Sequence, residues 1–320
     1  MSRNTCLVAA LVIAASAGIA LAQVAGPDAM MKGIEFTRAS SVYPYNSGSA
    51  RQALEQLAAT GANWVTIVPV WWMSDTGASS VFWMLDQSPS DAEVRQAVRW
   101  ARQLGLRVFM KPEVHCLSGA EPRLHDPHDN TWFYSYSSFI RHFAVLAQEE
   151  TCAMFCVGTE LDNSADEPWE RDQWTAIVRY VKSLFLGPVT YAADWRTYRR
   201  IPFWDSLDYV GINAYFPLRD DAVPYPLSDT VKYLAQGWKT RWIPEIEAFR
   251  TSQGWSDSVK PLVFTEVGYR SIEDCYIHPW DRQAAAPYDE RLQRHCYIAG
   301  LHSLLGKPWF AGWFWHEWTT

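Results

Sequence analysis

Residues 153–161, AMFCVGTEL, and residues 261–269, PLVFTEVGY, share one design. Each is a short apolar run of the kind that forms a fully buried strand, and in each a Thr-Glu pair follows the apolar run. Glutamate is depleted in strands, and burying its charge is costly unless a partner compensates it. For either residue alone, a strand-end glutamate paired with Arg or Lys is the structural alternative. Together, Glu160 and Glu266 indicate two carboxylates that share a function.

The rest of the chain alternates apolar runs with amphipathic segments, without a break in composition. Strands are predicted at residues 33–38, 63–70, 107–114, 153–161, 189–193, 209–215, 261–269 and 309–315. Helices are predicted at residues 49–60, 90–105, 132–149, 167–184, 229–250 (interrupted by Pro244) and 289–305. Eight strand units in this order predict an α/β fold, the parallel (β/α)8 or TIM barrel.

The sequence ends a few residues after the eighth predicted strand, so the eighth outer helix is missing from the given sequence. We expect the outer face between the first and seventh helices to be bare or covered by other means. A bare face would expose an apolar patch, which predicts low stability or association.

The first 22 residues have the pattern of a secretory signal. Arg3 supplies a positive charge, residues 7–21 are apolar, and small residues surround the expected cut after Ala22. The apolar run is short for a spanning helix and no basic stop-transfer segment follows it, so we expect no membrane anchor. We therefore expect residues 23–320 to form a single catalytic domain that is secreted or periplasmic and monomeric.

The overall composition is globular, with 48% hydrophobic and 20% charged residues. The net charge of -7 argues against a nucleic-acid partner, which needs a basic footprint. The chain contains 18 Trp, many of them beside predicted strand ends, where flat apolar rings could face sugar rings. Core packing accounts for roughly half of these rings in our expectation.

The cysteines are best explained as structural residues. Without the signal an odd number remains, so at least one thiol is free or pairs with another chain. An exported protein permits disulfides, and a Cys275–Cys296 bridge could tie down a long loop. Cys152 and Cys156 lack CxxC spacing and are expected in the core. The six are Cys6, Cys116, Cys152, Cys156, Cys275 and Cys296.

In a barrel of this kind the active site lies at the C-terminal ends of the strands. The residues that close the predicted strands are carboxylates, aromatic rings and hydrogen-bonding groups. They are Arg38, Trp71, Trp72, Glu113, His115, Glu160, Asp194, Trp195, Asn213, Tyr215, Glu266, Tyr269, Trp313, Trp315 and His316. Glycoside hydrolysis needs two carboxyl groups beside the scissile bond and surfaces that hold sugar rings. The predicted rim therefore favours a glycosidase.

Five motifs, in their order and spacing, resemble glycoside hydrolase family 113, the β-mannanase family of clan A. They are Lys111-Pro112 ahead of polar residues, VGTEL (157–161), YAADW (191–195), TEVGY (265–269) and GWFW (312–315). The likeness covers nearly the whole of residues 23–320. It implies a retaining hydrolase of β-1,4-linked mannan-type polysaccharide or oligosaccharide.

The resemblance also implies roles for single residues. Glu160 would be the acid/base, Glu266 the nucleophile, and Tyr215 would donate a hydrogen bond to Glu266. Most of the clan carries Asn where Thr159 stands, so the contact to the sugar 2-hydroxyl differs here. The acid needs a raised pKa and the nucleophile must be ionised. We expect Glu160 in the more apolar setting and the two carboxyl groups about 5–5.5 Å apart, the retaining separation.

Four further rim residues are candidates for substrate binding. Trp195 and Trp315 are predicted stacking platforms, with core packing as the alternative. Asp194 and Asn213 could bind hydroxyl groups.

The remaining rim candidates each carry an alternative. His115 either binds sugar or is hydrogen-bonded at a strand end. Arg38 either pairs with Glu35 or Glu113, or supports the nucleophile. Trp71 and Trp72 must point to opposite sides of their strand, so only one can face the substrate, and Trp71 is our candidate.

We expect no metal and no cofactor. The loop at residues 125–129, HDPHD, contains metal-ligand types but is expected to be a solvated turn. The HxH strand signature of barrel metallohydrolases, a phosphate loop and a serine nucleophile elbow are missing from the sequence. The alternatives left open are a non-catalytic carbohydrate-binding barrel, a β-glycanase acting on glucan, xylan or galactan, and a metal-dependent hydrolase.

Overall fold

The computed structural model describes residues 30–127, 129–165, 167–220, 230–256 and 259–320. Parallel strands close into a barrel in the order β1-β10-β9-β8-β7-β6-β4-β2. They are β1 (Met31–Thr37), β2 (Trp64–Ile67), β4 (Arg107–Met110), β6 (Met154–Thr159), β7 (Val189–Asp194), β8 (Val210–Asn213), β9 (Leu262–Val267) and β10 (Phe310–Thr319). This arrangement confirms the predicted (β/α)8 barrel. The predicted signal peptide and Cys6 lie outside the described residues.

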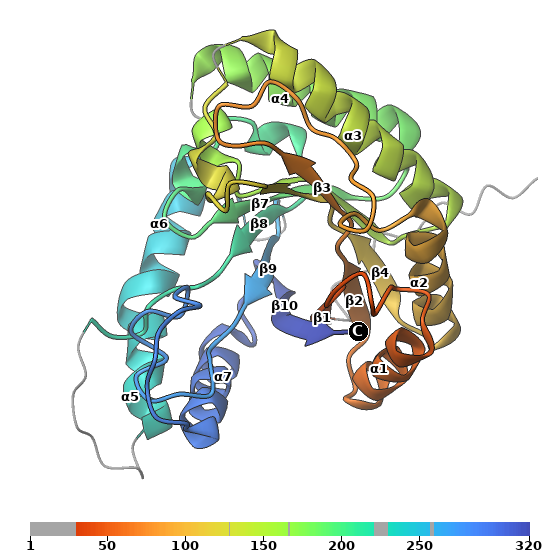
Figure 1. Cartoon of the computed structure of the whole chain (residues 1–320). Helices are drawn as coiled ribbons and strands as arrows, with labels where there is room; N and C mark the ends of the chain where they lie inside the picture. Colours follow the sequence, from red (N-terminus) through yellow and green to blue (C-terminus); the bar gives the residue numbers. More distant parts are fainter. Residues whose placement is uncertain (1–29, 128, 166, 221–229, 257–258) are drawn as a thin grey trace, which may run out of the picture.

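The helices line the outside of the barrel in an arc that is open between α7 and α1 (Figure 1). They are α1 (Gly48–Ala59), α2 (Asp91–Gln103), α3 (Asn130–Glu149), α4 (Pro168–Leu184), α5 (Thr230–Gly237), α6 (Ile243–Ser252) and α7 (Glu290–Leu304). Short 3-10 turns at Tyr198–Arg200 and Trp204–Ser206 connect β7 to β8. None of the described helices is both long and apolar enough to cross a membrane.

Local sequence explains where these helices begin. Ser90 and Glu93 form the predicted capping box at the start of α2. Asp129 and Asp289 cap α3 and α7 with their side chains. Pro244 does not end the predicted helix, because a π-helical turn, Trp238–Trp242, joins α5 to α6 and places Pro244 in the first turn of α6.

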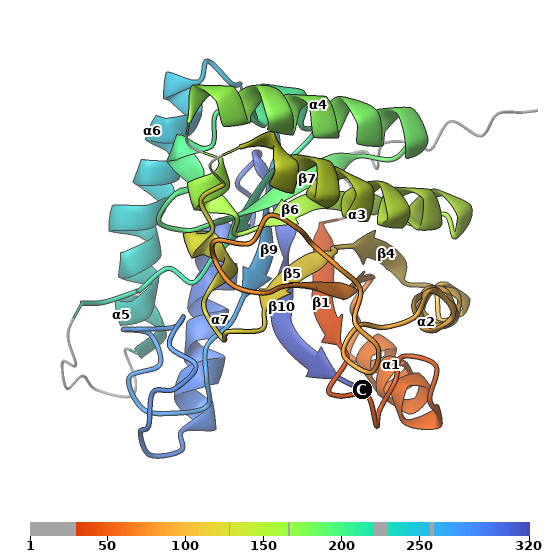
Figure 2. The same ribbon diagram turned by 45° about the horizontal axis from the view of Figure 1, so that its top comes forward.

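Two predicted strands are each divided by a proline. After Pro69 and Pro112, which have no N–H to donate to a sheet, the chain leaves the barrel and forms β3 (Val70–Met73) and β5 (Glu113–Cys116). These strands make a separate two-stranded parallel sheet. β3 is labelled in Figure 1 and β5 in Figure 2. The barrel strands β2 and β4 are correspondingly shorter than predicted.

Large apolar side chains fill one part of the barrel interior. Gly33 is required there, because a Cβ at this position would lie 2.1 Å from the ring of Phe314. The same cluster contains Met31, Trp64, Phe109, Met154, Cys156, Ala192, Tyr209 and Val263. Polar groups are buried on other strand residues, among them Glu35, Asn213 and Glu266. The barrel strands therefore carry both a cluster of buried apolar side chains and a cluster of buried polar side chains.

Within the described residues, no helix covers β1 and β10 between α7 and α1, where the C-terminus lies (Figure 1). Ile34, Trp315 and Trp318 are only partly buried there, and they pack against the core. The expected patch is therefore partly covered. The predicted low stability or association stays a prediction.

The described cysteines are all free and buried, so Cys152 and Cys156 are core residues as predicted. Cys275 and Cys296 do not form the possible disulfide bridge. Their sulfur atoms lie 3.8 Å apart and share a thiol hydrogen bond.

Candidate active site

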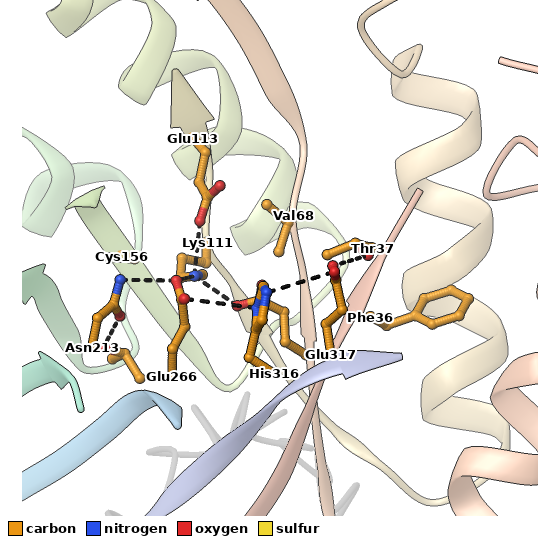
Figure 3. A network of polar contacts seen from close by, with 12 residues as sticks. Phe36, Thr37, Val68, Lys111, Glu113, Cys156, Asn213, Glu266, His316 and Glu317 are labelled. Carbon is orange, nitrogen blue, oxygen red and sulfur yellow. Dashed lines mark hydrogen bonds and ion pairs between the residues drawn. The ribbon is translucent and has the colours of Figure 1, made fainter. Parts of the chain in front are cut away.

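A buried lysine occupies the centre of the polar cluster. Lys111 directly follows β4 and is fully buried, and its Nζ atom lies 2.6 Å from Oε2 of Glu35 and 2.8 Å from Oε1 of Glu113. The same atom contacts Oε1 of Glu266. Figure 3 shows Lys111 joined to Glu113 and Glu266 by these contacts. One cation thus holds carboxylates from three strands.

A hydroxyl group and an imidazole ring also lie beside Glu266 in β9. The hydroxyl of Tyr215 donates to Oε2 at 2.8 Å, the contact expected from the family resemblance. His316 of β10 places Nδ1 3.7 Å from the same oxygen and 3.0 Å from Oε1 of Glu35. Burial alone would raise the pKa of Glu266, but the positive charges of Lys111 and His316 outweigh it and lower this pKa. Glu266 is therefore held as a carboxylate.

Glu160 lies directly after β6 and has the opposite electrostatic setting. Burial, reinforced by the negative charges of Glu266 and Asp194, raises its pKa to about 8. Its backbone adopts φ +48°, a left-handed conformation that is uncommon outside glycine. The backbone N–H of Glu160 donates to Ala192 at 2.8 Å, and the next N–H, of Leu161, donates to the Tyr191 hydroxyl at 2.8 Å. Glu160 is therefore protonated at neutral pH and held in an unusual turn.

One amide connects the two glutamates. Nδ2 of Asn213 donates to Oε1 of Glu160 at 2.8 Å and to Oε1 of Glu266 at 2.9 Å. Thr265 donates to Oδ1 of Asn213 at 2.8 Å, which fixes the orientation of the amide. Because both oxygens accept from the same nitrogen, the distance between them cannot exceed the combined length of the two hydrogen bonds. That bound is below the roughly 6.5–9.5 Å that separates the carboxyl groups of inverting glycosidases.

Lys111 and Glu35 were not among the predicted site residues. Lys111 entered only as part of a motif, and Glu35 only as a partner for Arg38. The sequence feature that could have identified them is a charged residue within or directly after an apolar strand. Thr159 stands at the position where the clan usually has Asn, and the amide beside the glutamates comes from Asn213.

Two predicted site residues, Trp71 and Trp315, point away from the polar cluster. Trp71 packs against Phe139 of α3, with ring centroids 5.2 Å apart, so it belongs to the core between the small sheet and α3. Trp315 lies 4.2 Å from the ring of Tyr297 in α7, on the outer side of the barrel. These placements correct both predictions.

Arg38 is also corrected. Its Nε lies 3.4 Å from Glu93, and it donates to the carbonyl of Gln87 at 3.2 Å. The expected pairs with Glu35 or Glu113 do not form, and the cation beside the nucleophile candidate is Lys111.

The other candidates lie around the rim. Asp194 is buried and accepts from Nε of Arg196 at 2.8 Å, so its carboxylate already has a partner. Trp195 is partly buried and packs against Trp280, with centroids 5.2 Å apart. His115 is 48% exposed and lies 3.4 Å from Glu113.

The donor set does not favour a metal centre. Ligand atoms of Glu35, Glu266 and His316 lie within 4.8 Å of one another. Lys111 already forms ion pairs with both carboxylates, and the ring of His316 is engaged with Glu35. In the loop at 125–129, His125 is buried and bonded to Ser164 and to the carbonyl of Ala78, so this part is not the solvated turn we expected. Residue 128 lies outside the described residues.

Two shallow hollows lie away from this cluster. One, of about 390 Å³, is lined by Glu290, Arg291, Gln293, Arg294 and Tyr297. The other, of about 170 Å³, is lined by residues of the β7–β8 connection and Gln253. Neither contains a predicted site residue.

Comparisons with known proteins agree with the barrel fold. A β-mannanase of glycoside hydrolase family 113 (GH113), AaManA from Alicyclobacillus acidocaldarius, superposes with a TM-score of 0.77 at 26% identity, covering 92% of this chain and 88% of that one. A GH113 β-1,4-mannanase superposes equally well at 22% identity, covering 91% and 89%. A GH5_18 protein from Bifidobacterium longum, at 14% identity and a TM-score of 0.61, covers 90% and 69% and shares the fold.

No curated protein matches the sequence. The family model for Glycoside Hydrolase Family 113 matches residues 34–320, nearly all of the described structure. The chain therefore belongs to glycoside hydrolase family 113.

Proposed function

We propose that this glycoside hydrolase cleaves β-1,4-linked mannan-type chains with retention at the anomeric carbon. One observation carries the proposal: the shared Asn213 amide holds together a glutamate whose pKa is raised to about 8 and a glutamate whose pKa is lowered. Two adjacent carboxyl groups driven apart in pKa are what an acid and a nucleophile need. Glu160 has the proton and Glu266 has the charge.

The first step joins the substrate to the protein. Glu160 gives its proton to the glycosidic oxygen, a carboxylate oxygen of Glu266 bonds to the anomeric carbon, and the bond from that carbon to the glycosidic oxygen breaks. Lys111, Tyr215 and His316 keep Glu266 ionised and fixed in orientation before the attack. The leaving chain departs with a free hydroxyl group.

The second step releases the sugar. Glu160, now a carboxylate, takes a proton from water while the water oxygen attacks the anomeric carbon and Glu266 leaves. Both steps invert the same carbon, so the product keeps the starting configuration. The Nδ2 atom of Asn213, directed between the carboxylates, is in place to meet the sugar 2-hydroxyl, the contact that most of the clan assigns to the residue before the acid.

The mannan preference is supported by the relatives. AaManA, at 26% identity, is a β-mannanase. The test is a reducing-sugar assay of the purified protein on β-mannan, β-glucan, xylan and galactan, with Glu160→Ala as control. We expect product from mannan that depends on Glu160. Cleavage of another polysaccharide in preference to mannan would contradict the proposal that mannan is the substrate. Binding without cleavage would favour the non-catalytic alternative.

A further inference from the structure

The small sheet of β3 and β5 presents a face beside the catalytic centre. Each of its strands directly follows a barrel strand, after Pro69 and Pro112, at the barrel end where Lys111 lies. Val70 pairs with Glu113 and Trp72 pairs with His115 in this sheet. Because side chains alternate along a strand and partners lie opposite one another, these four side chains share one face. Trp72, and not Trp71, is therefore the tryptophan on the side of Glu113.

This face is continuous with the proposed nucleophile. Lys111 contacts Glu266 and lies 2.8 Å from Oε1 of Glu113. Oε2 of Glu113 lies 3.4 Å from Nε2 of His115, and the imidazole ring is edge-on to Trp72 with centroids 5.5 Å apart. A line of contacts thus runs from Glu266 out to an indole ring. Two residues along a strand span about 7 Å, a length on the scale of one sugar unit.

The opposite face of the same sheet already serves the core. Trp71 packs against α3, while Met73, Val114 and Cys116 are buried in the main hydrophobic cluster. Trp72 is only partly buried and is not among the side chains packed against that cluster. The side chain of His115 is 48% exposed. Folding therefore uses one face of this sheet and leaves the Trp72–His115 side accessible.

We propose that Trp72 and His115, with Glu113, form a second sugar subsite, which binds the unit of the β-linked chain next to the one held between Glu160 and Glu266. The proposal rests on the proposed function. The indole ring offers an apolar surface to a sugar ring, and the imidazole and the carboxylate bind its hydroxyl groups. Lys111 and His115 lower the pKa of Glu113 against the effect of its burial, so the carboxylate accepts hydrogen bonds at neutral pH.

The test compares substrates of different length. Wild type, Trp72→Ala and the control Tyr180→Ala are assayed on an aryl β-mannoside, which contains one sugar, and on β-1,4-linked manno-oligosaccharides of three to six units. Tyr180 is 40% exposed on α4, away from the small sheet. We expect Trp72→Ala to lower the ratio of kcat/KM for the oligosaccharides to kcat/KM for the aryl mannoside by roughly tenfold, the scale of one aromatic contact. Tyr180→Ala should keep the wild-type ratio.

A wild-type ratio in Trp72→Ala would overturn the subsite, whether kcat/KM falls equally on both substrates or on neither. His115→Ala repeats the test at a half-exposed position if Trp72→Ala does not fold. A wild type that cleaves none of these mannosides would refute the proposed function instead. Calorimetric titration with mannohexaose then decides the subsite separately, because weaker binding by Trp72→Ala than by wild type supports it and equal binding overturns it.

Discussion

Glu160 and Glu266 accept hydrogen bonds from the same nitrogen of Asn213, at 2.8 and 2.9 Å, although they stand at the ends of different strands. Only Glu266 also contacts a buried ammonium group. This difference in partners, within one shared contact, gives the two side chains opposite protonation states. Four measurable consequences follow from the contacts around them.

The first concerns the pH dependence of activity. Because burial and the charges of Glu266 and Asp194 raise the pKa of Glu160 to about 8, kcat/KM should fall as pH rises through that value. Replacing Asp194 by Asn removes one of these negative charges, which lowers the pKa of Glu160. The basic limb of the pH profile should therefore move to lower pH. If the basic limb of the Asp194→Asn profile stays at its wild-type pH, Glu160 is not the group that titrates there.

The second concerns stability. The pKa of Glu160 is raised from 4.5 to about 8 on folding, so between these values the unfolded chain loses a proton that the folded chain keeps. Stability therefore falls as pH rises across this window. Glu160→Gln removes this loss and should be more stable than wild type at pH 8, with a smaller difference at pH 4.5. Thermal unfolding measures it, with exposed Glu55→Gln as control, and parallel pH curves would contradict it.

The third concerns Lys111. Lys111→Met leaves Glu35, Glu113 and Glu266 close together without their common cation. Removing one partner of a buried ion pair lowers the free energy of unfolding by about 3–5 kcal/mol. Lys182→Met, which breaks a half-exposed pair with Asp208, should lower it by about 0–1 kcal/mol. Urea denaturation compares the two, and equal losses would show that Lys111 does not stabilise the cluster.

The fourth concerns the turn that carries Glu160. The Tyr191 hydroxyl accepts from Leu161 N–H at 2.8 Å and donates to Asp162 at 3.1 Å. Tyr191→Phe frees the turn, so it should lower kcat on mannan by roughly tenfold, the scale of one hydrogen bond. The loss should be smaller on a dinitrophenyl mannoside, whose leaving group needs no proton.

Tyr136→Phe is the matched control for Tyr191. It also removes a buried hydroxyl, one that donates to the carbonyl of Val157 at 2.8 Å. We expect it to affect both substrates alike. The same pattern in Tyr191→Phe would reduce Tyr191 to a structural residue.

The sequence was sufficient to predict the barrel and the two glutamates, because each depends on a local pattern. Apolar runs alternate with amphipathic segments, and a Thr-Glu pair follows the apolar part of two of them. Asn213 and Tyr215 could be found for the same reason, as polar residues at a strand end.

The directions of the side chains could not be predicted, because they depend on features that the pattern of apolar and polar residues does not contain. Pro69 follows β2 and a new sheet begins after it, so the sequence did not show which of Trp71 and Trp72 faces the site. The register of β10 shifts between Trp313 and Trp315, and Trp315 points outward. Lys111 and Glu35 are partners only because distant strands meet in the closed barrel.

The most direct test of the account is to trap the covalent intermediate. 2-Deoxy-2-fluoro-β-mannosyl fluoride reacts by loss of fluoride as a glutamate oxygen bonds to the anomeric carbon, and the fluorine at C2 slows the second step. Mass spectrometry of peptides from the labelled protein should find the fluorosugar on Glu266 and none in Glu266→Gln. A label on Glu160, or no label in a preparation that cleaves mannan, would contradict the assignment of Glu266 as nucleophile.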